Sequence, residues 1–282
     1  MLVDAQVHAY EADSPARPWV HPLPDLEVPE ITGEQMVAAM DAVGVDGAIL
    51  VSPWLQYRTD TSYAETAYLA HPDRFRLVAP VDHLREGVAA RVHEWSATPG
   101  AAGIRLFVLP RKPFGADLPG VRDAIAGATA AGLPVNVQCW GFLDALHELA
   151  GAYPDTQFVL DHLGLEQPHF PPAPPDALAG LDTVLALARH PNVAIKLTGV
   201  CTYSRRPFPY DDLWQPVARV LDAYGIERCL WGTDWQRATP MLSYLQAVDS
   251  FRHHWPLSAG DRAALMGENA VRIYHWDAGG RP

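Results

Sequence analysis

The chain has 282 residues and a formal net charge of −12, with 49% hydrophobic and 19% charged residues. This length allows one α/β barrel or two smaller domains, and the acidity argues against a nucleic-acid or anionic-membrane partner. The three cysteines are odd in number and form no Cys-x-x-Cys pair, which favours a reducing cytoplasm over a disulfide framework. The N-terminus has no basic, apolar leader, so we expect neither a signal peptide nor a membrane span.

Short apolar segments alternate with longer stretches of helical patterning along the whole chain. Eight segments are predicted as strands buried on both faces: residues 2–8, 46–52, 76–82, 102–108, 134–140, 158–164, 193–199 and 229–235. Eight strand–helix repeats predict a (β/α)₈ TIM barrel, with residues 1–282 as one domain. A doubly wound open sheet is the alternative, weakened because no Gly-x-Gly-x-x-Gly follows an early strand.

Two proline-rich stretches, residues 12–30 and 166–176, follow the first and sixth predicted strands. Because the barrel pattern resumes after each of them, they are expected to be long loops over the mouth of the barrel and not domain linkers.

Helix boundaries are marked by capping signals. Residues 32–35 form a capping box, and Ser258 is predicted to cap the final helix. Gly44, Gly132 and Gly225 each precede an apolar residue, so they are expected in the left-handed conformation just past a helix end.

Polar side chains stand at the ends of the predicted strands, where a barrel of this type carries its chemistry. They are Gln6 and His8 on the first strand, Arg105 and Arg111 on and after the fourth, Gln138 and Trp140 on the fifth, Asp161 and His162 on the sixth, Lys196 on the seventh and Asp234 on the eighth. Each of these residues could have a purely structural role, such as a core histidine or an ordinary salt bridge. The convergence of all of them on one mouth of the barrel favours a functional role. We expect His162 in the mouth and Asp161 in a structural role.

Aromatic residues also follow several strands: Trp54 and Tyr57 after the second, Trp140 on the fifth, and Tyr203 and Phe208 after the seventh. Together they suit a flat or extended apolar substrate, although any single one is equally well explained as a loop anchor.

Three motifs carry a family resemblance: "FVLDHLG" at 158–164, "LWGTDW" at 230–235 and "GENAVRIY" at 267–274. Together they resemble the amidohydrolase superfamily. More narrowly, they resemble its amidohydrolase-2 branch, which contains 2-pyrone-4,6-dicarboxylate lactonase, related lactonases and some decarboxylases.

Metal-dependent members of this superfamily use His-x-His on the first strand and Asp on the eighth. This chain has Gln6-Val7-His8, and Gln138 stands where relatives often offer a histidine. A neutral amide is a poor zinc or manganese ligand, so the resemblance implies at most weak Zn or Mn binding. If a metal is held, its ligands would be His8, His162 and Asp234.

The resemblance implies a hydrolase acting on a lactone or a similar activated carbonyl. Asp234 would activate water, and His8 and His162 would polarise the carbonyl. The substrate-binding residues would be Arg105, Arg111, Gln6, Gln138, Trp140, Trp54 and Tyr57. Burial between Trp231 and Trp235 is expected to raise the pKa of Asp234.

Three alternatives stay open at this point: a metal-dependent amidohydrolase that tolerates glutamine, a non-oxidative decarboxylase, and a non-catalytic ligand-binding or cyclase-like helper barrel. The expected partner is a small molecule of aromatic or carboxylated character, with assembly into a homo-oligomer left open. If Gln6 marks a lost metal site, Gln6→His should restore affinity for zinc or manganese.

Overall fold

The computed structural model describes residues 1–20, 29–108, 113–168 and 170–276. Arg111 lies outside these residues. The eight strands are all parallel and follow one another around the sheet in chain order. They are β1 (Val3–Val7), β2 (Gly47–Val51), β3 (Phe75–Val81), β4 (Ala101–Phe107), β5 (Val135–Gln138), β6 (Phe158–Leu160), β7 (Val193–Thr198) and β8 (Cys229–Gly232).

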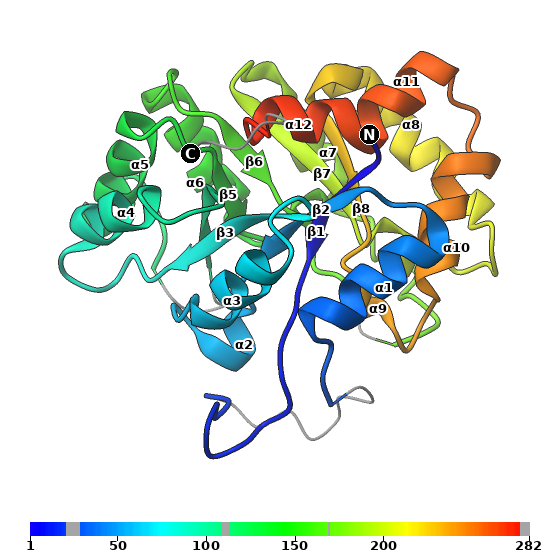
Figure 1. Cartoon of the computed structure of the whole chain (residues 1–282). Helices are drawn as coiled ribbons and strands as arrows, with labels where there is room; N and C mark the ends of the chain where they lie inside the picture. Colours follow the sequence, from blue (N-terminus) through cyan, green and yellow to red (C-terminus); the bar gives the residue numbers. More distant parts are fainter. Residues whose placement is uncertain (21–28, 109–112, 169, 277–282) are drawn as a thin grey trace.

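Helices surround the strands, as Figure 1 shows. The α-helices are α1 (Gly33–Val43), α2 (Trp54–Tyr57), α3 (Ser62–Ala70), α4 (Val88–Ser96), α5 (Pro119–Ala130), α6 (Leu143–Ala152), α7 (Leu181–Ala186), α8 (Trp214–Tyr224), α9 (Trp235–Ala238), α10 (Tyr244–Asp249), α11 (Ala259–Ala263) and α12 (Asn269–Ile273). The predicted (β/α)₈ TIM barrel is therefore confirmed.

The capping predictions hold with one exception. Thr32 accepts from the backbone N–H of Gln35, Ser258 accepts from that of Asp261, and Gly44 is left-handed at φ 69° and ψ 41°. Gly132 also has a positive φ of 67°. The prediction for Gly225 was wrong, because its ψ of 145° is extended and leads the chain into the turn before β8.

The seam between β1 and β8 closes through the backbone and the side chain of Asp4. The Asp234 N–H donates to the Gln6 carbonyl at 3.0 Å. Asp4 Oδ1 accepts from the backbone N–H of Gln6 at 3.1 Å and of Thr233 at 2.9 Å. Gly232 permits this close approach, since a Cβ there would lie 3.0 Å from both Asp4 Oδ1 and the backbone nitrogen of Gln6.

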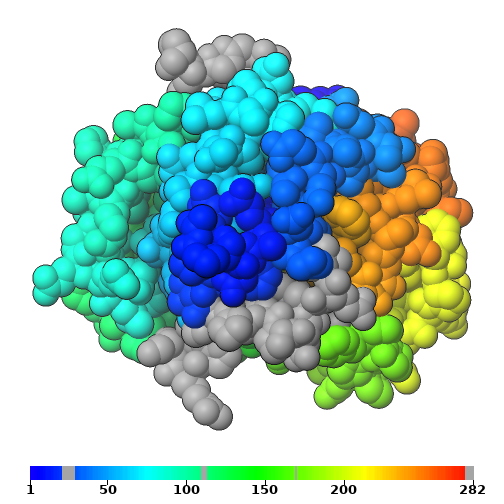
Figure 2. All heavy atoms as spheres, turned by 60° about the horizontal axis from the view of Figure 1, so that its bottom comes forward, coloured from blue at the N-terminus to red at the C-terminus, as the bar shows by residue number. Residues whose placement is uncertain are grey.

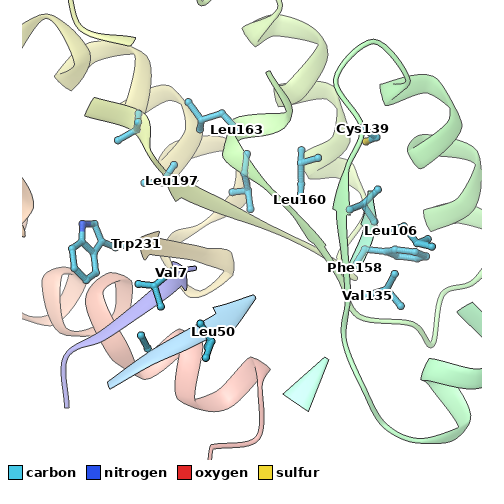
Figure 3. Packing of buried hydrophobic residues seen from close by; sticks show 14 of the residues in the cluster. Val7, Leu50, Leu106, Val135, Cys139, Phe158, Leu160, Leu163, Leu197 and Trp231 are labelled. Atoms are coloured by element: carbon cyan, nitrogen blue, oxygen red, sulfur yellow. The ribbon is translucent and has the colours of Figure 1, made fainter. Parts of the chain in front are cut away.

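Two apolar layers support the barrel. The outer layer lies between the strands and the helices, and Figure 3 shows part of it, including Val7, Leu50, Leu160 and Trp231. The inner layer fills the amino-terminal half of the barrel and is completed by side chains of the α12 region. It contains Val3, Ala5, Ile49, Val51, Val78, Ala102, Val159, Ala194, Leu230, Ala270, Ile273, Tyr274 and Trp276.

Above this floor the interior becomes polar on several strands. On β7 the inward positions read Ala194, Lys196 and Thr198, all fully buried. The alternation of a strand thus delivers a charged group to the barrel interior and a hydroxyl to its mouth.

Candidate active site

The carboxyl ends of the eight parallel strands meet on one face of the barrel. This face is at the bottom of Figure 1 and turns forward in Figure 2, where the dark-blue segment after β1 lies near its centre. Eight of the strand-end residues singled out from the sequence are joined by a continuous set of contacts: Gln6, His8, Arg105, Gln138, Asp161, His162, Lys196 and Asp234.

A buried ion cluster lies at the centre of the site. Asp161, directly after β6, pairs through Oδ2 with Arg105 Nε at 2.7 Å and through Oδ1 with Lys196 Nζ at 3.1 Å. Desolvation alone would raise the pKa of Asp161, but the two cations outweigh it and hold the pKa at about 2. Asp161 is therefore a fixed anion that compensates two buried cations.

Gln6 connects this cluster to His162. Its Oε1 accepts from Lys196 Nζ at 3.1 Å, and its Nε2 lies 3.1 Å from Nε2 of His162. Arg105 Nη2 approaches the same His162 nitrogen at 3.1 Å and also donates to Gln138 Oε1 at 2.8 Å. Gln6, which replaces the first histidine of the His-x-His motif, thus contacts the Lys196 ammonium group and a ring nitrogen of His162.

Asp234 lies between two histidines. Its Oδ1 is 3.3 Å from His8 Nε2, and its Oδ2 is 3.8 Å from His162 Nδ1. His8 Nδ1 lies 2.6 Å from the Val51 carbonyl, which can only accept, so Nδ1 carries the hydrogen. The His8 nitrogen left to exchange a proton with Asp234 is therefore Nε2.

The pKa of Asp234 differs from the value expected from the sequence. Burial would raise the pKa of its carboxyl, but His162, His8 and Arg237 more than offset this and place the pKa well below its usual range. The expected rise was therefore wrong. Burial lowers the pKa of His162 to about 4, so that ring is neutral near pH 7.

Asp234 and His162, whose side chains meet in the mouth of the barrel, both have a left-handed backbone conformation. Asp234 has φ 49°, His162 has φ 52°, and Leu163 follows at φ 57°. Such conformations are uncommon for residues other than glycine and concentrate at functional sites. Here the turn at His162 directs its ring to the same centre that Asp161 reaches from the preceding residue.

The other predicted binding residues divide into two groups. Gln138 has its Oε1 occupied by Arg105, and its Nε2 has no hydrogen-bond partner among the described residues. Trp54 stacks on Phe107 with ring centroids 5.4 Å apart, and Phe107 lies under the Arg105 guanidinium at 5.2 Å. Trp140, two residues beyond the end of β5, is half-buried.

The second group lies elsewhere. The Tyr57 hydroxyl accepts from the Glu11 N–H at 3.0 Å, and its ring packs near Arg17, so it anchors the loop after β1. The Tyr203 hydroxyl donates to the carbonyl of His162 at 3.3 Å, behind the site. Phe208 packs edge-on against Tyr210 and His254.

Several residues that contribute to the site were not singled out from the sequence. Thr198 Oγ1 lies 3.0 Å from His162 Nδ1, and Arg237 contributes positive charge near Asp234. Tyr274 donates to Asn136 Oδ1 at 2.6 Å, and its ring lies 5.6 Å from Lys196 Nζ. From the sequence, Asn136 and Thr198 could have been identified only by their inward-facing positions on the strands β5 and β7.

The chain matches the amidohydrolase family over residues 3–276. It belongs to that family. Among curated proteins it is 38% identical over 96 residues to an L-fucono-1,5-lactonase of Burkholderia multivorans, covering 31% of this chain and 32% of that enzyme. It is 26% identical to the 4-sulfomuconolactone hydrolase of Hydrogenophaga intermedia, covering 73% of this chain and 66% of that enzyme. These matches span from about a third to about two thirds of the relatives' own lengths.

Solved structures share the fold. A probable 2-pyrone-4,6-dicarboxylic acid hydrolase from Acinetobacter baumannii superposes with a TM-score of 0.79 at 16% identity, over 97% of this chain and 99% of that one. An amidohydrolase from Burkholderia multivorans with bound zinc has a TM-score of 0.77 at 24% identity, over 98% and 99% of the two chains.

The residues at the centre of this barrel do not fit a zinc site of that kind. No group of three or more His, Cys, Asp or Glu side chains within the described parts of the chain is arranged to hold a metal ion. His162 Nε2, the nitrogen nearest Gln6, faces two N–H donors, and Lys196 and Arg105 already supply positive charge.

No helix in the described ranges is both long and apolar enough to cross a membrane.

Proposed function

We propose that this amidohydrolase hydrolyses a lactone, with water activated by Asp234 and without a tightly bound metal. The observation that carries the proposal is the Asp234 carboxylate, almost fully buried, at the end of β8 between His8 Nε2 and His162 Nδ1. In a chain of this family, that arrangement provides a fixed anion next to a ring nitrogen that can exchange a proton.

Hydrolysis needs a base for water, a donor to the carbonyl oxygen and a proton for the leaving oxygen. A water oxygen attacks the lactone carbonyl carbon while one of its protons passes to Asp234. The low pKa of Asp234 makes it a weak resting base. Transfer of that proton to His8 Nε2, 3.3 Å away, then regenerates the carboxylate.

In the second half of the reaction the proton on His8 moves on to the leaving oxygen. The tetrahedral intermediate collapses, the ring C–O bond breaks, and the ring oxygen takes the proton from His8. The product is an open-chain hydroxy acid, and His8 loses the proton that it received from Asp234. Gln138 Nε2 is suited to donate to the carbonyl oxygen, because Arg105 holds the amide with its oxygen turned away.

The substrate class follows from the relatives and the lining of the site. The relatives act on a fuconolactone and a sulfomuconolactone, both of them cyclic esters. The stacked Trp54–Phe107 wall supports a flat ring, and Trp54 Nε1 is a buried donor without a partner among the described residues. Arg105 is 2% exposed and already paired with Asp161, so recognition of a substrate carboxylate falls to Arg111 in this proposal.

The proposal also includes a cytoplasmic location, which agrees with three free, buried cysteines.

The test is an acid-release assay on a panel of aldonolactones, muconolactones and pyrone carboxylates, before and after treatment with a chelator. Asp234→Asn should lower kcat/KM by about 10²–10⁴-fold, because it removes the base and preserves the shape of the side chain. Asp182→Asn, at an exposed pair with Arg219, is the matched control and should leave turnover unchanged.

The outcomes separate the alternatives. Activity that survives chelation and disappears in Asp234→Asn supports the proposal. Activity that depends on added zinc or manganese would refute the metal-free mechanism. Ring rearrangement without acid release would identify an isomerase, as in the D-galactarolactone isomerase of Agrobacterium fabrum, which is 27% identical over 83% of this chain. Carbon dioxide release would identify a decarboxylase.

A further inference from the structure

We propose that Lys196 and Arg105 are positioning residues that fix His162 in one tautomer, with hydrogen on Nδ1 and none on Nε2. Arg105 acts on the ring directly, and Lys196 acts through Gln6. The tautomer itself is independent of the proposed function, whereas its consequence for catalysis rests on that function.

The argument starts at Lys196, whose ammonium group can only donate. It lies 3.1 Å from Gln6 Oε1 and 3.1 Å from Asp161 Oδ1, in a fully buried position. If the Gln6 amide were turned over, its NH₂ group would face the ammonium, donor against donor. The lysine therefore sets the amide with its oxygen inward and Nε2 toward His162.

The second step follows from the polarity of that amide. Gln6 Nε2 is a donor and lies 3.1 Å from His162 Nε2. Arg105 Nη2, also a donor, lies 3.1 Å from the same nitrogen. Two donors directed at one ring nitrogen require a lone pair there, so Nε2 carries no hydrogen and Nδ1 must carry it.

The third step gives the consequence for the reaction. The Nδ1–H of His162 points to Thr198 Oγ1 at 3.0 Å and toward Asp234 Oδ2 at 3.8 Å. The ring therefore presents a hydrogen, and not a lone pair, to the carboxylate proposed as base. His8 remains the histidine that exchanges protons with Asp234, and the Nδ1–H of His162 is directed to Thr198 Oγ1.

The charges around His162 come from several elements. Asp161 and Asp234 favour a charged ring, whereas Arg105 and Arg237 oppose it, and burial opposes it most strongly. A change at Gln6 that replaces the donor by an acceptor should shift this balance toward protonation of Nε2.

Nitrogen-15 NMR of histidine-labelled protein at pH 7 tests the inference without any substrate. The His162 signal is assigned by its loss in His162→Asn. The wild type should show a single tautomer with hydrogen on Nδ1. Gln6→Glu has the same shape but offers only acceptors, so Arg105 alone still donates to His162 Nε2. The population of His162 rings with hydrogen on Nε2 should therefore rise.

Lys196→Met leaves the Arg105–Asp161 pair intact and electrically balanced, so folding is expected to survive. It should weaken the preference of His162 for one tautomer and lower kcat with little change in KM. Gln35→Glu, in the exposed capping box of α1, makes the same chemical change far from the site and should leave the His162 signal unaltered.

Hydrogen on His162 Nε2 in the wild type, or an unchanged His162 signal in Gln6→Glu, would overturn the inference. Either result is independent of whether Asp234→Asn abolishes lactone hydrolysis, so the two proposals can fail separately.

Discussion

Asp161→Asn is the substitution for which the structure gives the clearest magnitude. Asp161 is 1% exposed and is the counter-ion of Arg105 and Lys196. Its pKa falls from 3.8 to about 2 in the folded protein. This difference corresponds to roughly 2 to 3 kcal/mol in favour of the ionised form. Loss of one partner from a buried ion cluster costs about 3–5 kcal/mol in comparable sites.

We therefore expect Asp161→Asn to lower the free energy of unfolding by about 3 kcal/mol at pH 7. For a chain of this length, that corresponds to a fall in Tm of about 6 °C. Urea unfolding and calorimetry measure both quantities. The exposed pair of Asp182 with Arg219 supplies the control, because Asp182→Asn should cost less than about 1 kcal/mol.

The pH dependence of this effect has a definite sign. The folded pKa of Asp161 is depressed, so its stabilisation is present above pH 3.8 and is lost as the pH falls toward 2. The stability difference between wild type and Asp161→Asn should accordingly narrow below pH 4. A loss of less than about 1 kcal/mol at pH 7, or a difference that does not narrow in acid, would refute the assignment of Asp161 as the compensating anion.

Three further predictions concern the seam and the metal question. Burial raises the pKa of Asp4 to about 6, so its stabilising protonated form is lost as the pH rises through 6. Relative to Asp4→Asn, the wild type should lose up to about 3 kcal/mol between pH 4 and pH 8 in urea titrations. Gly232→Ala should destabilise the fold and abolish turnover, since its Cβ would contact Thr198 Cγ2 at 2.4 Å; a normal Tm in calorimetry would contradict this. Gln6→His should gain no tight zinc or manganese site in calorimetric titration, because Lys196 already faces that position.

The barrel was predictable because its signals repeat. Eight apolar segments, each followed by a helix with its own caps, leave few arrangements, and parallel strands bring their carboxyl ends to one face. Asp234 and His162 could be assigned to the mouth on this basis alone, and the structure brings both there with His8.

The pairing among these residues was not predictable. Arg105 and Gln138 looked equally suited to bind a substrate, but contacts across the barrel give Arg105 to Asp161 and leave Gln138 Nε2 unpaired among the described residues. Which polar groups satisfy one another depends on register and side-chain direction, which a strand pattern does not contain. The prediction for the pKa of Asp234 was wrong for the same reason, because His162, His8 and Arg237 lower that pKa and come from three different segments of the chain.

The glutamine on the first strand fits the charge balance of the barrel interior. Arg105 and Lys196 carry two positive charges, and Asp161 and Asp234 carry two negative charges, while His162 is neutral near pH 7. These four charged groups are almost fully buried and cancel one another, and Arg237 adds a further positive charge near Asp234. A divalent ion added beside them would leave two uncompensated charges in a medium of low polarity, which is strongly unfavourable. The neutral amide of Gln6 accepts from Lys196 and donates to His162, so it leaves this charge balance unchanged. A histidine at position 6 could bind a metal ion, but it would add no negative charge to balance the charge of that ion.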